Sequence, residues 1–330
     1  MPQQFRLKCR PHGPGAPVEW DYTQTELPDL KDGEVHLKLH YISIDPGMKG
    51  WITDKKSYMP AVPEGDVMRA FGVGEVVASK SDRLPVGSYA TGLTGVQTEA
   101  VLDARGLRSV DPNIAPLSHY MSGLGMPGYT GFFGMSDLGK PEAGKTIVVS
   151  ACAGAVGSIA SQTAKLMGAR VIGIAGGAEK CAWLTDKFGL DEAIDYKAGG
   201  LDEALRKTCP DGIDTYFDNV GGDTLDAVLM HMNRKGRIVL CGGISQYDDI
   251  EKATGPSNYL QIVTQSLSVH GFTMMDYFHR IPEAVAQLAQ WQADGRMVFF
   301  EHIVDGFEEF PDAFNMIFDG RNFGKLMIKV

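Results

Sequence analysis

A glycine-containing turn at residues 151–157 is the part of the sequence with the clearest chemical meaning. It reads ACAGAVG and lies between the apolar run TIVVS and a segment in which apolar residues recur at helical spacing up to Gly168. A strand, a tight turn and a helix in this order present main-chain N–H groups and the positive end of a helix dipole to an anion. The pattern predicts a site for the pyrophosphate of a dinucleotide.

The turn departs from the usual glycine fingerprint at its first position, which is occupied by Cys152. The match is therefore Ala151, Gly154 and Gly157 at three-residue spacing. Gly154 would let a ligand approach the backbone, and Gly157 would let the helix press on the strand. Tight packing without a ligand is the alternative interpretation, but the strand, turn and helix context favours the dinucleotide.

The end of the next strand bears on which dinucleotide binds. NAD sites usually place an acidic residue about 20 residues beyond the turn, whereas this chain reads GGAEK at 176–180. We therefore predict that Lys180 pairs with the 2′-phosphate of NADP. A solvated lysine in the first turn of a helix is the simpler alternative.

Two kinds of pattern divide the chain and indicate an α/β fold. After about residue 126, short apolar runs alternate with amphipathic segments, including a helix over 222–232 before a strand over 236–242. Six such runs predict a doubly wound parallel sheet, a Rossmann domain, over 126–298. Residues 1–125 are rich in short β-branched and aromatic runs and predict a β-rich domain. Residues 299–330 end in a strand pattern that could return to it.

Composition excludes several classes of function. The chain has 31 basic and 41 acidic residues, a net charge of −10, and no basic cluster, which argues against nucleic acid as a partner. Its first residues are charged and proline-containing rather than apolar, and the longest weakly polar run carries polar residues, so we expect a cytoplasmic protein without a membrane span. Five widely spaced cysteines without a CxxC pair, and histidines that do not cluster, predict reduced thiols and no metal site. A GxSxG nucleophile elbow does not occur.

Four blocks of sequence together resemble a known enzyme family. They are AGAVGSIASQTAKLMGARVIGIAGGAEK, YFDNVGG, GRIVLCGGISQY and NFGKLMIKV. They are similar to the zinc-independent medium-chain reductases of the leukotriene B4 dehydrogenase, prostaglandin reductase and curcumin reductase group. The resemblance spans Asp45 to Val330. It implies a GroES-like domain joined to a Rossmann domain, a homodimer, and NADPH-dependent reduction of the carbon–carbon double bond of enones and enals.

The resemblance also assigns cofactor contacts to positions in this sequence. The motif residues FDNVGG and CGGI are ordinary turn formers as well, but each follows a predicted strand, where a doubly wound sheet binds its ligand. The implied cofactor contacts are Ala153, Gly154, Ala155, Val156, Gly157, Lys180, Tyr196, Asn219, Cys241, Gly242, Gly243, Ile244, Ser245, Gln246, Tyr247, Phe272, Thr273, Met274 and Asn322.

The implied chemistry needs a hydrogen-bond donor near the nicotinamide. Hydride attack on the β-carbon moves negative charge onto the carbonyl oxygen, and a donor there supplies commonly ~3 kcal/mol. A hydroxyl can then deliver a proton to the α-carbon. Tyr259 is our candidate, although one alignment places Thr264 at this position and a packed aromatic is the alternative.

The resemblance places the predicted substrate contact in a loop near residues 45–60. Tyr58 lies in a stretch that resembles the substrate-lining loop of curcumin-type reductases, and we predict that it lines the pocket. The neighbouring DPGMKG departs from the family's DPYMRG at Gly47 and Lys49, which predicts a roomier pocket and an altered substrate preference.

Two other functions remain open from the sequence. A quinone reductase would use the same hydride on a flatter acceptor. A nucleotide-binding protein without turnover would keep the fold alone, because a fold does not guarantee activity. In all three cases the predicted ligand is NADPH, with an enone, enal or quinone as substrate in the first two.

Overall fold

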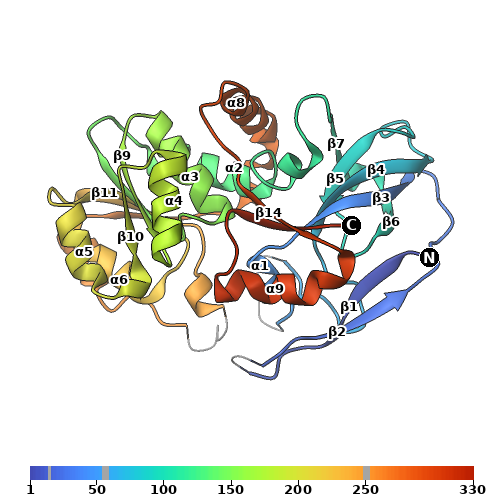
Figure 1. Cartoon of the computed structure of the whole chain (residues 1–330), viewed down its shortest axis with the longest axis horizontal. Coiled ribbons are helices and arrows are strands. Elements are labelled where there is room, and N and C mark those ends of the chain that lie inside the picture. Colours follow the sequence, from blue (N-terminus) through green and yellow to red (C-terminus); the bar gives the residue numbers. More distant parts are fainter. Residues whose placement is uncertain (14–15, 54–58, 248–252) are drawn as a thin grey trace. The chain divides into compact units, whose positions relative to one another are not determined.

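The computed structural model describes residues 1–13, 16–53, 59–247 and 253–330. These residues form two compact units (Figure 1). Unit 1 comprises Met1–Met121 with Glu301–Val330, and unit 2 comprises Ser122–Phe300. In the described part of the chain no helix is both long and apolar enough to cross a membrane.

Unit 2 is a doubly wound α/β sheet, which confirms the predicted fold class. In the described ranges its six parallel strands lie in the spatial order β10 (Glu192–Asp195), β9 (Arg170–Ala175), β8 (Thr146–Val149), β11 (Ile213–Asp218), β12 (Met232–Leu240) and β13 (Ser268–Gly271). The order reverses direction between β8 and β11. Ligands of such sheets bind beyond the carboxyl ends of the strands at this switch point.

Helices cover both faces of this sheet. Because successive strand residues point to opposite sides, each strand contributes to two cores. Val149 of β8 joins a core with Ala160 and Leu184, whereas Val148 joins a second core with Leu205 and Val228. Burial on both faces explains why the strands are continuous apolar runs in the sequence. The helices of unit 2 are α2 (Met126–Phe133), α3 (Ala155–Leu166), α4 (Ala178–Phe188), α5 (Leu201–Thr208), α6 (Gly222–Leu229), α7 (Leu260–Thr264) and α8 (Ile281–Ala293).

One predicted boundary is wrong. The helix expected over 222–232 ends at Leu229, and β12 already begins at Met232. Met232 is 5% exposed and pairs with Ile213 of β11. The local pattern around Met232 also suits a helix, but pairing with a buried neighbouring strand places this residue in a strand.

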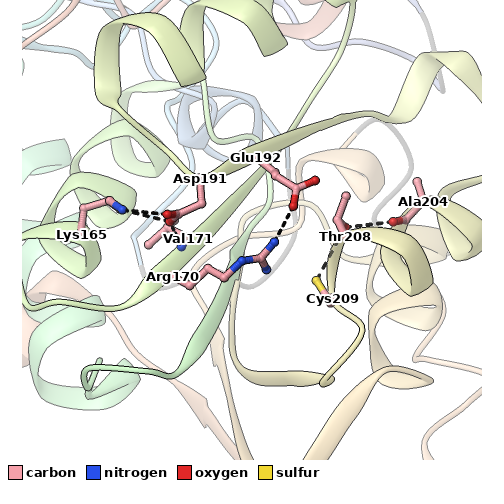
Figure 2. A network of polar contacts seen from close by, with 8 residues as sticks. All are labelled: Lys165, Arg170, Val171, Asp191, Glu192, Ala204, Thr208 and Cys209. Atoms are coloured by element: carbon pink, nitrogen blue, oxygen red, sulfur yellow. Dashed lines mark hydrogen bonds and ion pairs between the residues drawn. The ribbon is translucent and has the colours of Figure 1, made fainter.

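The amino ends of β9 and β10 are held together by charged side chains (Figure 2). The Asp191 carboxylate accepts hydrogen bonds from the Lys165 ammonium at 3.0 Å and from the Val171 N–H at 2.6 Å. Partial burial by itself would raise the pKa of Asp191, but these two donors together lower it. Arg170 and Glu192 pair across the same strands. Since this edge lies opposite the carboxyl ends of the strands, we assign these contacts to the stability of unit 2.

Unit 1 is β-rich, and the end of the chain completes its sheet. In the described residues its main sheet has seven strands. Six lie in the order β14 (Glu301–Asp305), β15 (Lys325–Lys329), β3 (Glu34–Ser43), β4 (Phe71–Ser79), β5 (Tyr89–Leu93) and β7 (Leu107–Val110), and the seventh, β6 (Glu99–Asp103), pairs with β3. β1 (Gln3–Cys9) and β2 (Glu19–Gln24) form a separate hairpin, and the helices are α1 (Gly47–Trp51) and α9 (Phe310–Asp319). β15 pairs antiparallel with β3, so the carboxyl-terminal strand lies in the sheet of unit 1.

Candidate functional site

The turn after β8 is made by an alanine in a left-handed conformation. Ala151 has a φ of +45°, and its carbonyl accepts a hydrogen bond from the Gly154 N–H at 2.9 Å. A left-handed φ costs a residue with a Cβ on the order of 1 kcal/mol. The tight turn that the fingerprint normally assigns to its first glycine is therefore made here one residue earlier.

Cys152, at the position of the first fingerprint glycine, points into the core. It is 0% exposed, and its Sγ would lie 3.0 Å from a Cβ added to Gly173 of β9. The missing side chain at Gly173 thus makes room for the cysteine. Burial raises the pKa of the Cys152 thiol to about 12. The thiol therefore packs as an apolar group.

Two glycines shape the start of α3. A Cβ on Gly157 would lie 2.4 Å from the Ala151 carbonyl oxygen and 2.8 Å from Cys152 Cα, so the helix presses directly on the turn. Gly154 is the N-cap residue, and no side chain caps this helix end. The first-turn N–H groups of a helix without a side-chain cap can bind an anion.

The loops after β11 and β12 lie against each other at the switch point. The Ile244 N–H donates to the Asn219 carbonyl at 3.1 Å, and the Ser245 N–H donates to the Val220 carbonyl at 3.2 Å. The structure therefore brings Asn219 together with the predicted run 241–247. Both loops follow the carboxyl ends of central strands, where sequence reasoning placed them.

The ends of β9 and β10 converge on Gly176. A Cβ on Gly176 would lie 2.9 Å from both Tyr196 Cε1 and Lys197 Cε. Asp195 Oδ1 accepts hydrogen bonds from the N–H groups of Gly177 at 2.7 Å and Lys197 at 2.9 Å, which ties the two strand ends together. Lys180 lies in the first turn of α4, directly after this glycine pair. Lys197 is a cation that the sequence analysis missed, although it is the next residue after Tyr196.

The segment Phe272–Met274 follows β13, but its first side chain is used for packing. A Cβ on Gly134 would lie 2.6 Å from the Phe272 ring, so this ring covers the π-helical turn Gly134–Gly139 that follows α2. Thr273 caps the next 3-10 helix through its side chain, and Met274 is 8% exposed. Cofactor contact by this segment stays a prediction.

Three further predicted residues lie apart from the turn and loops described above, in different parts of the chain. Tyr259 precedes α7 and is 58% exposed. Asn322 belongs to unit 1, where its side-chain amide donates to the Gly324 carbonyl at 3.1 Å. Tyr58 lies outside the described residues.

A buried ion pair anchors the start of the loop in unit 1 that carries DPGMKG. The Lys325 ammonium donates to the Ile44 carbonyl at 2.6 Å and to Asp45 Oδ1 at 2.7 Å. Burial lowers the pKa of Lys325. The Lys49 ammonium lies 4.7 Å from the centre of the Phe318 ring on α9. The family resemblance had drawn attention to Lys49 but not to the pair that holds the loop.

Histidine, cysteine and acidic side chains do not gather into a metal-binding group in the part of the chain that the structure describes. In the described ranges no group of three or more histidine, cysteine, aspartate or glutamate side chains could hold an ion.

The chain matches two known protein families. These are the family described as N-terminal domain of oxidoreductase, over residues 3–110, and the family described as zinc-binding dehydrogenase, over residues 155–290. It is 37% identical to the NADPH-dependent curcumin reductase of Escherichia coli over 99% of this chain and 96% of that protein. It is 39% identical to prostaglandin reductase 1 of Rattus norvegicus over the full length of both.

A solved structure shares the whole fold. The crystal structure of CurA from Vibrio vulnificus in complex with NADPH has a TM-score of 0.93 and 40% identity, and the alignment covers 99% of both chains. Family membership at this identity extends over both units. The chain belongs to the zinc-independent medium-chain dehydrogenase/reductase family, in the group of leukotriene B4 dehydrogenase, prostaglandin reductase and curcumin reductase.

Proposed function

We propose that the protein reduces the carbon–carbon double bond of α,β-unsaturated ketones or aldehydes with NADPH. The observation that carries this proposal is the full-length similarity to curcumin reductase and to the NADPH complex of CurA. The geometry of unit 2 supports it, because the start of α3 lacks a side-chain cap beside the turn at Gly154 and Gly157. That helix start fits the pyrophosphate of a dinucleotide.

The residues around Gly176 fit the adenosine end of the cofactor. Tyr196 and Lys197 reach the end of β9, and Lys180 begins α4 beside it. Cations at this point favour a 2′-phosphate, whereas NAD sites place a carboxylate there to bind the ribose hydroxyls. The Asp195 carboxylate at this end accepts main-chain N–H groups. We propose that Lys180 and Tyr196 hold the 2′-phosphate and that Lys197 adds a second cation.

The protein's own task at the reacting end is orientation and proton supply. NADPH, when bound, supplies the hydride for the β-carbon. The developing charge on the carbonyl oxygen then needs a donor, and the α-carbon needs a proton. We propose the Tyr259 hydroxyl for this role. We propose Tyr58 as a substrate contact. The further cofactor contacts that we propose are the loops 219–222 and 241–247, the segment Phe272–Met274, and Asn322.

The proposed reaction is tested by NADPH oxidation with an enone, an enal and a quinone, followed by the mass of each product. We expect the enone and the enal to gain two hydrogens across the double bond while the carbonyl is retained. Reduction of the quinone alone would replace this function by that of a quinone reductase. Binding of NADPH without turnover of any acceptor would leave a nucleotide-binding protein.

Replacing Tyr259 by phenylalanine is expected to lower kcat about 100-fold, since a positioned general acid contributes at least this much. The variant keeps the aromatic ring and removes only the hydroxyl. Thr264→Ala is the matched control, because Thr264 is the other residue that an alignment places here and its hydroxyl donates to the Gln261 carbonyl at 3.4 Å. Steady-state kinetics at saturating NADPH measures both. A large loss in Thr264→Ala with none in Tyr259→Phe would transfer the role to Thr264.

We propose a homodimer formed through the edge of unit 2. β13 is an edge strand of the sheet. The described segment around it exposes six large apolar side chains, which are Tyr259, Leu260, Val263, Val269, Met275 and Phe278. An apolar surface of this kind marks an interaction site, and an unpaired strand edge can pair with a second copy.

The dimer is tested with Val263→Asp, because Val263 is 71% exposed. Light scattering after size exclusion should give the mass of a dimer for the natural chain and a monomer for the variant, since the new charge would be buried. Val86→Asp is the control, because Val86 is 63% exposed but lies in unit 1. A monomeric natural chain at micromolar concentration would contradict the proposal.

We place the protein in the cytoplasm, a reducing compartment, on the basis of its five unpaired cysteines.

A further inference from the structure

A buried carboxylate lies at the switch point of the sheet, at the end of β11. Asp218 is 1% exposed. Its Oδ1 accepts hydrogen bonds from the N–H groups of Val220 and Gly221, each at 2.9 Å. The same oxygen accepts from the hydroxyls of Tyr216 at 2.8 Å and Ser150 at 3.2 Å. The second oxygen, Oδ2, is buried without a hydrogen-bond partner among the described residues. Among the described residues, all hydrogen bonds of this carboxylate are therefore directed at one oxygen.

Asp218 connects the three loops that follow β8, β11 and β12. Its carboxylate bonds to Ser150 after β8 and to its own loop. Its main-chain carbonyl accepts the N–H groups of Cys241 at 2.8 Å and Gly242 at 3.1 Å, after β12. A displacement of this one residue would move all three loops at the carboxyl end of the sheet.

Ser150 extends the network to the side chain of Asn219. Its Oγ accepts the Asn219 N–H at 2.9 Å, and its carbonyl accepts the Asn219 side-chain amide at 2.7 Å. Two bonds from one residue fix both the backbone and the side chain of Asn219. The orientation of Asn219 thus depends on Ser150. The Ser150 hydroxyl in turn has two acceptors, Asp218 Oδ1 at 3.2 Å and the Phe217 carbonyl at 3.4 Å, of which the carboxylate is the nearer.

We propose that Asp218 is a positioning residue for the reaction, which holds Asn219 and the loops after β8 and β12 in the arrangement that NADPH requires. The proposal rests on the proposed function. It adds a residue that touches neither substrate nor cofactor and acts through Ser150 and Asn219. Removing a group that orients the ligands of a bound metal typically costs tenfold to a hundredfold in affinity or activity, and we expect a change of the same size here.

A second carboxylate on the same strand provides a matched control. Asp214, near the amino end of β11, accepts the Thr146 N–H at 2.9 Å, the Lys145 ammonium at 3.2 Å and the Asn233 amide at 3.2 Å. It also bridges β8 and β12, but at the edge of the sheet opposite the loops. Loss of Asp214 therefore measures what a bridging carboxylate contributes to stability alone.

The experiment compares Asp218→Ala, Asp218→Asn and Asp214→Ala by NADPH titration, by kcat and KM for an enone at saturating NADPH, and by Tm. We expect Asp218→Ala to raise the Kd of NADPH about 10-fold and to lower kcat about 100-fold. Asp218→Asn should recover most of both, because its amide oxygen can accept the bonds that Oδ1 accepts. Asp214→Ala should lower Tm and leave the Kd and kcat unchanged.

Ser150→Ala keeps the test decisive if Asp218→Ala does not fold, because it removes only the hydroxyl between Asp218 and Asn219. We expect a weaker effect in the same direction. Natural Kd and kcat in a folded Asp218→Ala or Ser150→Ala variant would overturn the proposal, as would equal losses in Asp214→Ala. If the natural protein binds NADPH but reduces no enone, the proposed function fails, and the Kd values alone still decide the role of Asp218.

Discussion

Replacing Gly157 by alanine is expected to destabilise unit 2 and to weaken NADPH binding at least about tenfold. Alanine normally stabilises a helix by about 1 kcal/mol relative to glycine. Here its Cβ would lie 2.4 Å from the Ala151 carbonyl oxygen, which is a main-chain atom that cannot rotate away. Overpacking of this kind costs about 1–3 kcal/mol. The turn must shift, and the N–H groups at the start of α3 then lose their alignment with the pyrophosphate.

The matched variant is Gly154→Ala, three residues earlier. Gly154 has an ordinary φ of −87°, and the closest atom to an added Cβ would be the Ala151 carbonyl oxygen at 3.1 Å. We expect its free energy of unfolding to change by less than about 1 kcal/mol, while NADPH binding weakens because the side chain stands where the ligand approaches. Chemical denaturation and NADPH titration separate the two effects. A stable Gly157→Ala variant with natural affinity would show that the close contact at the turn is dispensable.

Replacing Lys180 by alanine is expected to raise the Kd of NADPH about 10- to 100-fold and to leave the Kd of NADH nearly unchanged. A hydrogen bond to a charged group contributes about 1.5–3 kcal/mol, and only NADPH carries the 2′-phosphate that would receive it. Fluorescence titration with both cofactors gives the ratio. The effect should shrink as salt is added, since Lys180 is only half-buried and its ion pair would be partly screened.

Two further lysines test where the selectivity resides. Lys187 lies in the last turn of the same helix, and Lys187→Ala should leave both affinities unchanged. Lys197 lies beside Gly176, and Lys197→Ala should weaken NADPH binding by a smaller factor than Lys180→Ala. Equal losses for NADPH and NADH in Lys180→Ala would show that this lysine does not recognise the 2′-phosphate.

Local sequence was sufficient for most of unit 2, because its strands are buried on both faces. Runs such as TIVVS have to be covered on two sides, so their alternation with amphipathic segments determines a doubly wound sheet. The helix predicted over 222–232 failed at its end because Met232 is drawn into pairing with Ile213, which lies about 20 residues away in the sequence. Such pairing depends on a neighbour that no local pattern shows.

Cys152, at the first fingerprint position, is a second case in which a local pattern does not show a contact with a residue distant in the sequence. The sequence showed that Cys152 replaces a glycine, but not that Gly173 on the next strand leaves the space for it. Cys152, in the turn after β8, comes to lie against Gly173 of β9 only after the sheet forms. The loss of one glycine is thus matched by another that is distant in the chain.

The sequence by itself determined the fold class, the glycine turn between strand and helix, the family and, through the resemblance, the cofactor. Each depends on residues close together in the chain, where spacing fixes geometry through the helix and strand periods. Only the tertiary structure decided that Lys197 joins Tyr196 at Gly176, that Lys325 pairs with Asp45, and that Asp218 bonds to three loops. These contacts join segments that meet only when the sheets assemble. A buried charge is stabilised by the particular donors that surround it, and the order of residues along the chain does not name them.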